Sequence, residues 1–258
     1  MKNHLIIIEY DGTNFHGWQI QPNARTVQGE LEKALSIVCN EEIHINGTSR
    51  TDAGVHAYGQ AASFSGSFGI PVERIPIAAN NLLYDAKIKS AEEKPLDFHA
   101  RFDAKGKTYR YRISFAKEPD IFQTNYRYQL IESPDTSKMI EAGSLLVGTK
   151  DFASFMTAGG SEPESTVRTI TSVGIKRFDA IDSKGKKQEE IEIRVTGDGF
   201  LYNMVRIIVG TLIDVGYGKI HSDKMEEIIY SCKRENAGHT APANGLFLEK
   251  IFWEDLKG

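Results

Sequence analysis

The sequence predicts an α+β protein made of two ferredoxin-like halves, each an antiparallel sheet flanked by helices. Short apolar runs typical of strands alternate with segments whose apolar residues recur every three or four positions, and the order βαββαβ occurs twice. The chain has 258 residues and is 40% hydrophobic, which is enough to form a core in each half. We place the halves at 1–105 and 106–258, because Pro95 and a group of charges interrupt the pattern between Lys94 and Gly106.

The first half opens with a β-branched apolar run at 4–10, which predicts a strand that ends at the turn residues Asp11 and Gly12. A helix follows, because Thr26 is a suitable N-cap and an apolar stripe continues from it to about Cys39. The remaining expected elements are strands at 43–47, 60–68 and 86–92, with a helix at 71–83 between the last two.

The second half begins with the clearest strand of the chain, at 107–116, where Tyr109, Tyr111 and Ile113 alternate with polar residues. The elements expected after it are a helix at 139–146, strands at 167–178 and 190–195, helices at 201–216 and 223–232, and a closing strand at 246–253. If the helix at 223–232 is left aside, the order of the elements is again βαββαβ.

Composition limits the class of protein. No apolar run approaches the roughly 20 residues that cross a membrane, and the opening residues lack the features of a secretory signal. We therefore expect a soluble, cytoplasmic protein. Cys39 and Cys232 fall in helix-like apolar patterns, which predicts buried, reduced thiols. The formal charge is −4, so any RNA binding must depend on local basic clusters.

The stretch RTDAGVHA is the first candidate for chemistry. Arg50 precedes Asp52 by two residues and Gly54 follows it by two, so a tight turn can hold the carboxylate beside a guanidinium that keeps it ionised. An ionised aspartate can act as a nucleophile or a general base. The alternative is an Asx-turn at Asp52 with Arg50 as a solvated charge, and spacing alone favours this alternative.

The second candidate is the basic stretch ARFDAKGKTYRYR, residues 100–112, in which tyrosines alternate with arginines. Such a stretch suits RNA, because it combines phosphate contacts with flat surfaces on which bases stack. The alternative is an amphipathic strand with its aromatic residues in the core. We favour this alternative for Tyr111, whereas Tyr109, near the start of the strand, is expected at a cleft.

The third candidate is GDGFLYNMVR, a glycine turn that leads into an apolar helix. A GxG turn alone is a weak indication of phosphate binding. Arg206 interrupts the apolar face, and a half-buried guanidinium needs an anionic partner because isolation from water is costly. The seven histidines form no metal-binding motif, so no catalytic metal is expected.

Together these motifs resemble the TruA family of tRNA pseudouridine synthases over nearly the whole chain. The stretches that carry the resemblance are YDGTNFHGWQIQP with TVQGELEKAL, RTDAGVHA, HARF with KTYRY, DFASF, TVRTI, GFLYNMVRIIVG and TAPANGLFL. Two positions depart from the family pattern: Ser49 stands where a glycine usually precedes Arg50, and His239 stands where a proline usually precedes Thr240. Neither departure removes a reacting group, but either can alter the shape of a loop.

The resemblance implies a homodimer that isomerises uridine to pseudouridine in the tRNA anticodon stem-loop, at positions 38, 39 and 40, without cofactor or metal. It implies that Asp52 is the catalytic aspartate, in a cleft between the two halves. The implied substrate-binding residues are Arg50 beside the aspartate, Tyr109 facing the target base, Arg206 as the basic partner of Asp52, and Leu246 as an apolar wall of the pocket.

In such an enzyme the target base must leave the helix, and basic side chains must hold the phosphates; we expect Arg101, Lys107 and Arg168 in that role. Two other interpretations remain open. A non-catalytic RNA-binding protein would not need the aspartate with its two arginines. A carboxylate-dependent nucleoside hydrolase would need a second acid close to the first, and these motifs contain none.

Overall fold

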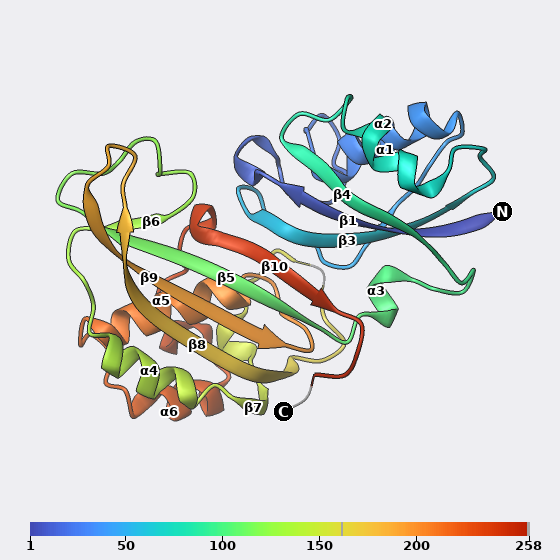
Figure 1. Cartoon of the computed structure of the whole chain (residues 1–258). Helices are drawn as coiled ribbons and strands as arrows, with labels where there is room; N and C mark the ends of the chain where they lie inside the picture. Colours follow the sequence, from blue (N-terminus) through green and yellow to red (C-terminus); the bar gives the residue numbers. More distant parts are fainter. Residues whose placement is uncertain (161, 257–258) are drawn as a thin grey trace. The chain divides into compact units, whose positions relative to one another are not determined.

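The computed structural model describes residues 1–160 and 162–256, which form two compact units (Figure 1). Unit 1 comprises Met1–Lys105 and Phe247–Asp255, and unit 2 comprises Gly106–Leu246 together with Leu256. Each unit is a sheet with helices on one face, so the chain is an α+β protein. The strand expected to close the second half, β10 (Leu246–Phe252), pairs with a strand of unit 1.

Unit 1 is built on a sheet in which β1 is the central antiparallel strand between β4 and β3. The short β2 pairs antiparallel with β3, and β10 lies parallel to β3. The elements are β1 (Lys2–Tyr10), η1 (Gly12–Asn14), α1 (Val27–Cys39), β2 (Asn46–Gly47), β3 (His56–Gly66), η2 (Val72–Arg74), α2 (Ile75–Ala79), β4 (Ala86–Lys94) and α3 (Ala100–Asp103).

Helix α1 begins and ends as its sequence predicts. The Thr26 side chain accepts a hydrogen bond from the Gly29 amide, and the left-handed Asn40 ends the helix. Most of the apolar stripe of α1 is buried, and Leu31 and Leu35 in it are fully buried, as are Ile6 and Ile8 of the central strand. This burial fixes α1 on one face of the sheet (Figure 1).

The helix expected at 71–83 is shorter in the structure. It consists of η2 followed by α2, which ends at Ala79. The reason lies in the next residue, because the Asn80 amide bonds both the carbonyl oxygen and the amide of Ile88, over 3.0 and 2.8 Å. The side chain of Asn80 thus pairs with the edge strand β4 at the point where a longer helix would continue.

Unit 2 has the antiparallel strand order β5-β9-β8-β7, and β6 is parallel to β5. Helices α4, α5 and α6 lie on one face of this sheet (Figure 1). The elements are β5 (Gly106–Phe115), β6 (Tyr128–Leu130), α4 (Thr136–Ser144), β7 (Gly148–Asp151), η3 (Ala153–Phe155), β8 (Val167–Ile181), β9 (Lys187–Gly197), α5 (Met204–Gly216), α6 (Lys224–Ser231), η4 (Arg234–Asn236) and η5 (Ala243–Gly245).

The core of unit 2 lies between the sheet and α5, where Ile113, Ile193, Ile208 and Leu212 are fully buried. One cysteine expectation is wrong: Cys39 is buried, but Cys232 is exposed because it follows the last turn of α6 in a left-handed conformation. Among the described residues, no helix is both long enough and apolar enough to span a bilayer.

Candidate active site

The Asp52 loop, residues 48–55, is held by hydrogen bonds to its backbone and to a buried side chain. The Trp18 amide donates to the Thr51 carbonyl oxygen over 3.0 Å, and the Val55 amide donates to the Asp52 carbonyl oxygen over 3.1 Å. The hydroxyls of Thr51 and Tyr10 share a buried hydrogen bond of 2.7 Å. Asp52 itself is half-buried. The loop therefore presents its carboxylate from a fixed backbone.

Two glycines of the preceding segment allow that backbone to be approached closely. A Cβ at Gly12 would lie 2.0 Å from the Val55 carbonyl oxygen, and one at Gly17 would lie 2.7 Å from the Thr51 carbonyl oxygen. Gly17 also has a φ of 87°, which disfavours any other residue. The Gly12 amide donates to His56 Nδ1 over 2.9 Å at the end of the loop. The segment from Gly12 to Trp18 thus packs closely against the Asp52 loop and restrains the path of its backbone.

Two residues that precede Asp52 in the loop differ in exposure. Arg50 is exposed, so its side chain is accessible to a ligand. The expected contact of its guanidinium with the Asp52 carboxylate stays a prediction. Ser49 is accommodated without strain, because its φ is not positive and its carbonyl oxygen accepts a bond of 2.7 Å from Gln60 Nε2.

In unit 2, the two tyrosines of β5 are both buried; the core position expected of Tyr111 is confirmed, whereas the position of Tyr109 at a cleft stays a prediction. Tyr111 is a core residue: it is fully buried, its hydroxyl donates to the Pro242 carbonyl oxygen over 2.7 Å, and burial raises its pKa well above the ordinary value. Tyr109 lies near the start of the strand, with 6% of its surface exposed. Its ring packs edge-on against Phe200, with the ring centroids 5.2 Å apart.

Arg206 lies in the first turn of α5 and is half-buried. Its Nε donates to the Ala241 carbonyl oxygen over 2.7 Å, and the Ala241 amide returns a bond of 3.1 Å to the Arg206 carbonyl oxygen. Its Nη1 donates to Asn203 Oδ1 over 2.7 Å. Two acceptors on different segments therefore fix the plane of the guanidinium.

The segment that carries Ala241, residues 237–242, is itself anchored on α5. The Gly238 amide donates to Thr211 Oγ1 over 2.9 Å, and the amide and ring Nδ1 of His239 both bond Asp214 Oδ2, over 3.2 and 2.9 Å. Burial raises the pKa of Asp214, but the bonds from His239 and Lys219 outweigh it and lower the pKa below the ordinary value. The unusual His239 thus fixes the backbone of this segment.

Leu246 follows the same segment at the start of β10 and is buried, with 5% of its surface exposed. Just before it, a Cβ at Gly245 would lie 2.7 Å from the ring of Tyr111. Leu246, Tyr109 and Arg206 belong to unit 2, whereas Asp52 and Arg50 belong to unit 1. The expected pairing of Asp52 with Arg206 stays a prediction.

The three expected phosphate contacts are spread over both units. Arg101 is an exposed residue of α3 in unit 1, and its guanidinium lies 5.8 Å from the centroid of the Phe102 ring. Lys107 and Arg168 lie near the starts of β5 and β8 in unit 2. Arg168 Nη1 is held by the Ser165 carbonyl oxygen at 2.8 Å, so its guanidinium has a defined position.

In the folded protein, acidic side chains lie beside some of the arginines of the basic stretch at 100–112. Strand β9 places acidic residues beside the arginines of β5, with Glu192 3.5 Å from Arg110. Glu190 is fully buried and bonds two arginines, Arg112 over 2.8 Å and Arg127 over 2.6 Å. Arg110 and Arg112 therefore pair with acidic residues of the same sheet, and a role for either in phosphate binding stays a prediction.

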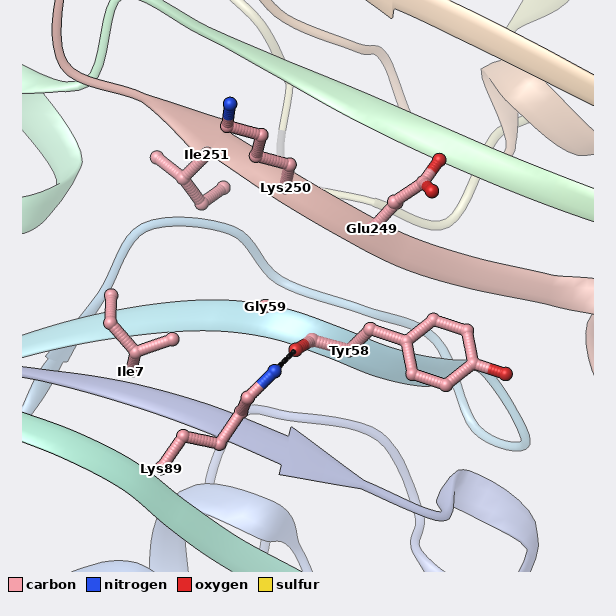
Figure 2. A pocket seen from close by; sticks show the side chains of 7 residues that line it. All are labelled: Ile7, Tyr58, Gly59, Lys89, Glu249, Lys250 and Ile251. Atoms are coloured by element: carbon pink, nitrogen blue, oxygen red, sulfur yellow. Dashed lines mark hydrogen bonds between the residues drawn. The ribbon is translucent and has the colours of Figure 1, made fainter.

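A small pocket of about 240 Å³ lies in unit 1 between β3 and β10 (Figure 2). Its lining residues are Ile7, Tyr58, Gly59, Lys89, Glu249, Lys250 and Ile251. The ammonium of Lys89 is held across it by the Tyr58 carbonyl oxygen at 3.0 Å. The expected site residues do not line this pocket. Among the described residues, no group of three His, Cys, Asp or Glu is placed to hold a metal ion.

A family model described as "tRNA pseudouridine synthase" matches residues 6–103 and 142–254. This chain belongs to the tRNA pseudouridine synthase family. The matched segments contain Asp52, Arg50, Arg206 and Leu246, whereas Tyr109 lies between them.

Relatives of the same description span the whole chain. The tRNA pseudouridine synthase A of Acetivibrio thermocellus is 46% identical over 254 residues, which cover 98% of this chain and 100% of that one. The proteins of the same name from Ruminiclostridium cellulolyticum and a Thermoanaerobacter species are 45% and 44% identical, each with 98% of this chain and 100% of the relative covered. The likeness is thus to complete family members.

Proposed function

We propose that this chain isomerises uridine to pseudouridine in the anticodon stem-loop of tRNA, at positions 38, 39 and 40, with Asp52 as the catalytic carboxylate. Family membership and the full-length similarity to tRNA pseudouridine synthases A support the reaction and the substrate. The observation that carries the residue assignment is the Asp52 loop, because a whole segment of unit 1 is shaped to hold it.

The reaction needs one well-placed carboxylate. The glycosidic C–N bond must break, the uracil must turn while it stays bound, and a C–C bond must form at the same sugar carbon. An aspartate can assist by attack on the sugar or the base, or by stabilising the positive charge that develops on the sugar. Such a group must be fixed and reachable, and Asp52 lies half-exposed on a backbone that close packing restrains.

The other residues take supporting roles in this proposal. Arg206 serves as the basic partner of Asp52, and its fixed guanidinium plane supports that role. Tyr109 faces the target base, and Leu246 forms an apolar wall beside it. Arg50 binds RNA, since its exposed side chain is able to fill the space that a flipped base leaves.

The substitution Asp52→Asn tests the assignment. Asparagine has the same shape and forms turns equally well, so the loop should fold and tRNA should bind within a small factor of wild type. An amide cannot act as an anionic nucleophile or base, so pseudouridine formation should fall below detection. The measurement is pseudouridine produced in a single turnover with protein in excess over tRNA.

The exposed Asp97, changed to Asn, is the matched control and should keep full activity. Substantial product from Asp52→Asn would reject Asp52 as the catalytic residue. Free uracil in place of pseudouridine would identify a hydrolase, and neither product from the wild-type protein would favour an RNA-binding protein.

Arg101, Lys107 and Arg168 hold tRNA phosphates in this proposal. Affinity should then fall with rising salt, because each neutralised phosphate releases counterions. Replacing Arg101 or Lys107 with Ala should weaken binding and flatten the salt dependence, while the rate on fully bound tRNA stays near that of wild type. An unchanged slope in both variants would place the RNA on another surface.

We further propose that the active form is a cytoplasmic homodimer that uses neither cofactor nor metal. A net charge of −4 leaves one chain with little positive surface for a long anticodon arm, and a second copy doubles that surface. Sedimentation of the active protein checks this, and a monomer mass with full activity at micromolar concentration would contradict it. We also propose that the first half has a ferredoxin-like fold. The element order β1-α1-β2-β3-α2-β4, with β4-β1-β3-β2 as the order of strands in the sheet, supports this proposal.

A further inference from the structure

Asn203 occupies an unusual backbone position at the start of α5. Its φ and ψ of 61° and 5° lie in the left-handed region, and its side chain makes no capping bond to the amides of the helix. An asparagine before a helix ordinarily has an extended backbone and caps the first turn with its side-chain oxygen. A left-handed residue other than glycine is uncommon and costs free energy. The side chain of Asn203 is therefore engaged in something other than starting the helix.

Its partners are two side chains that no capping motif would bring together. Oδ1 accepts from Arg206 Nη1 over 2.7 Å, and Nδ2 donates to Thr157 Oγ1 over 2.7 Å. The chemistry fixes the orientation of this amide, because a guanidinium only donates and must face the oxygen. Thr157 then accepts, so the three groups form a directed chain from the segment after η3 to the guanidinium.

The chain complements the bond from Arg206 Nε to the Ala241 carbonyl oxygen. Acceptors at both Nε and Nη1 hold the plane of the guanidinium and its rotation at two separate points. The Ala241 contact is part of an anchored segment, and the Asn203 contact is the second fixed point. A guanidinium that must meet a developing charge gains most from such pre-organisation.

We propose that Asn203 is a positioning residue for the reaction: it orients the Arg206 guanidinium, and Thr157 in turn orients Asn203. This inference rests on the proposed role of Arg206 in the active site. It assigns a function to two residues that touch neither the substrate nor the aspartate in the argument above, and whose effect passes through Arg206.

The substitution Asn203→Gly tests the inference directly, since glycine keeps the left-handed backbone and removes only the side chain. We expect the single-turnover rate to fall about 10- to 100-fold, while the Kd for tRNA changes by no more than about threefold, because a misplaced catalytic group affects the rate above all. Asn40→Gly is the matched control. Asn40 is also a left-handed asparagine, with φ 51° at the end of α1, and this variant should keep the wild-type rate.

Thr157 supplies a second test that does not depend on the fold of the first variant. Thr157→Val keeps the shape but removes the acceptor for Asn203 Nδ2, and we expect a rate reduced about 3- to 10-fold. Thr157→Ser keeps a hydroxyl and should restore the wild-type rate. A merely structural role would lower the melting temperature without this difference between Val and Ser.

The same assay on Arg206→Ala separates the two levels of the argument. If Arg206→Ala keeps the wild-type rate, the proposed role of Arg206 fails and the inference fails with it. If Arg206→Ala is slow but a folded Asn203→Gly is as fast as wild type, or Thr157→Val is as fast as Thr157→Ser, the inference alone is overturned. Slow Arg206→Ala, Asn203→Gly and Thr157→Val variants, with a fast Thr157→Ser, would support it.

Discussion

The Asp52 loop in unit 1 and the Arg206 region in unit 2 are held in place by different means. Around Asp52 close contacts between backbones are prominent, and glycines at 12 and 17 leave no room for a side chain. Around Arg206 the contacts are polar and largely involve side chains, with Asn203 on the guanidinium and Asp214 on His239. Close packing is sensitive to a change of side-chain size, whereas a buried hydrogen-bonded network is sensitive to the loss of a polar or charged partner.

The largest effect should come from charge in unit 2. Glu190→Gln keeps the volume of a fully buried residue but leaves Arg112 and Arg127 without their anion, so the free energy of unfolding should drop by about 3–5 kcal/mol. The neighbouring Glu189 pairs with Arg177 at the surface, and Glu189→Gln should leave the free energy of unfolding nearly unchanged. Urea unfolding of both variants measures the difference, and equal losses would contradict the role of charge in unit 2.

The next effect should come from size in unit 1. Gly12→Ala places a Cβ against the Val55 carbonyl oxygen, so the Asp52 loop must shift. We expect a loss of about 1–3 kcal/mol in stability and about a 100-fold loss in single-turnover rate. Gly69→Ala adds the same methyl group in open space and is the control. A fully active Gly12→Ala variant would show that the position of the Asp52 loop does not depend on close packing against Gly12.

The smallest effect should come from a buried polar side chain of unit 1, that of His4. His4 packs against Phe64 and Phe68, with both ring nitrogens buried and without hydrogen-bond partners. Burial lowers its pKa from the ordinary 6.5, while Glu93 raises the pKa and Lys2 lowers it further. At a pH just below 6.5, the unfolded chain therefore binds a proton at His4 more readily than the folded chain does.

Stability should consequently fall as the pH drops below about 6.5, by at most about 1.4 kcal/mol per pH unit. His4→Phe keeps the aromatic packing and should remove this part of the pH dependence. Thermal melting of the two proteins between pH 5 and pH 8 checks it, with the exposed His16→Phe as control. A pH profile unchanged by His4→Phe would reject the assignment.

The parts of the fold that follow local rules were predictable from the sequence. Helix α1 was expected because its cap and its apolar stripe lie next to each other in the chain, and β5 because alternation alone defines an amphipathic strand. The close packing of the segment from Gly12 to Trp18 against the Asp52 loop was not predictable. In the sequence Gly12 has the features of an ordinary turn residue, and its close approach to Val55 depends on tertiary packing. The second glycine of the segment, Gly17, was the sequence feature that could have indicated this packing.

The polar contacts of unit 2 were hidden for the same reason. Sequence reasoning identified Arg206 as a buried cation in need of a partner but missed Asn203, which lies one helical turn before it. An i, i+3 pair of asparagine and arginine is visible in the sequence, but only the left-handed backbone of Asn203 turns its side chain toward the helix face of Arg206. Likewise, the pairing of Glu190 with Arg112 depends on the register of β5 and β9.

The pairing of β10 with β3 has a consequence for the birth of the protein on the ribosome. Phe247 lies opposite His56, the residue that ends the Asp52 loop, although the two are about 190 positions apart. The start of strand β3, at His56 and Ala57, therefore emerges during translation without this partner, and it keeps an open edge there until nearly all of the chain has been made. The nascent first unit must lack its β10 strand throughout this time, so premature termination should yield a protein with an open strand edge next to the Asp52 loop.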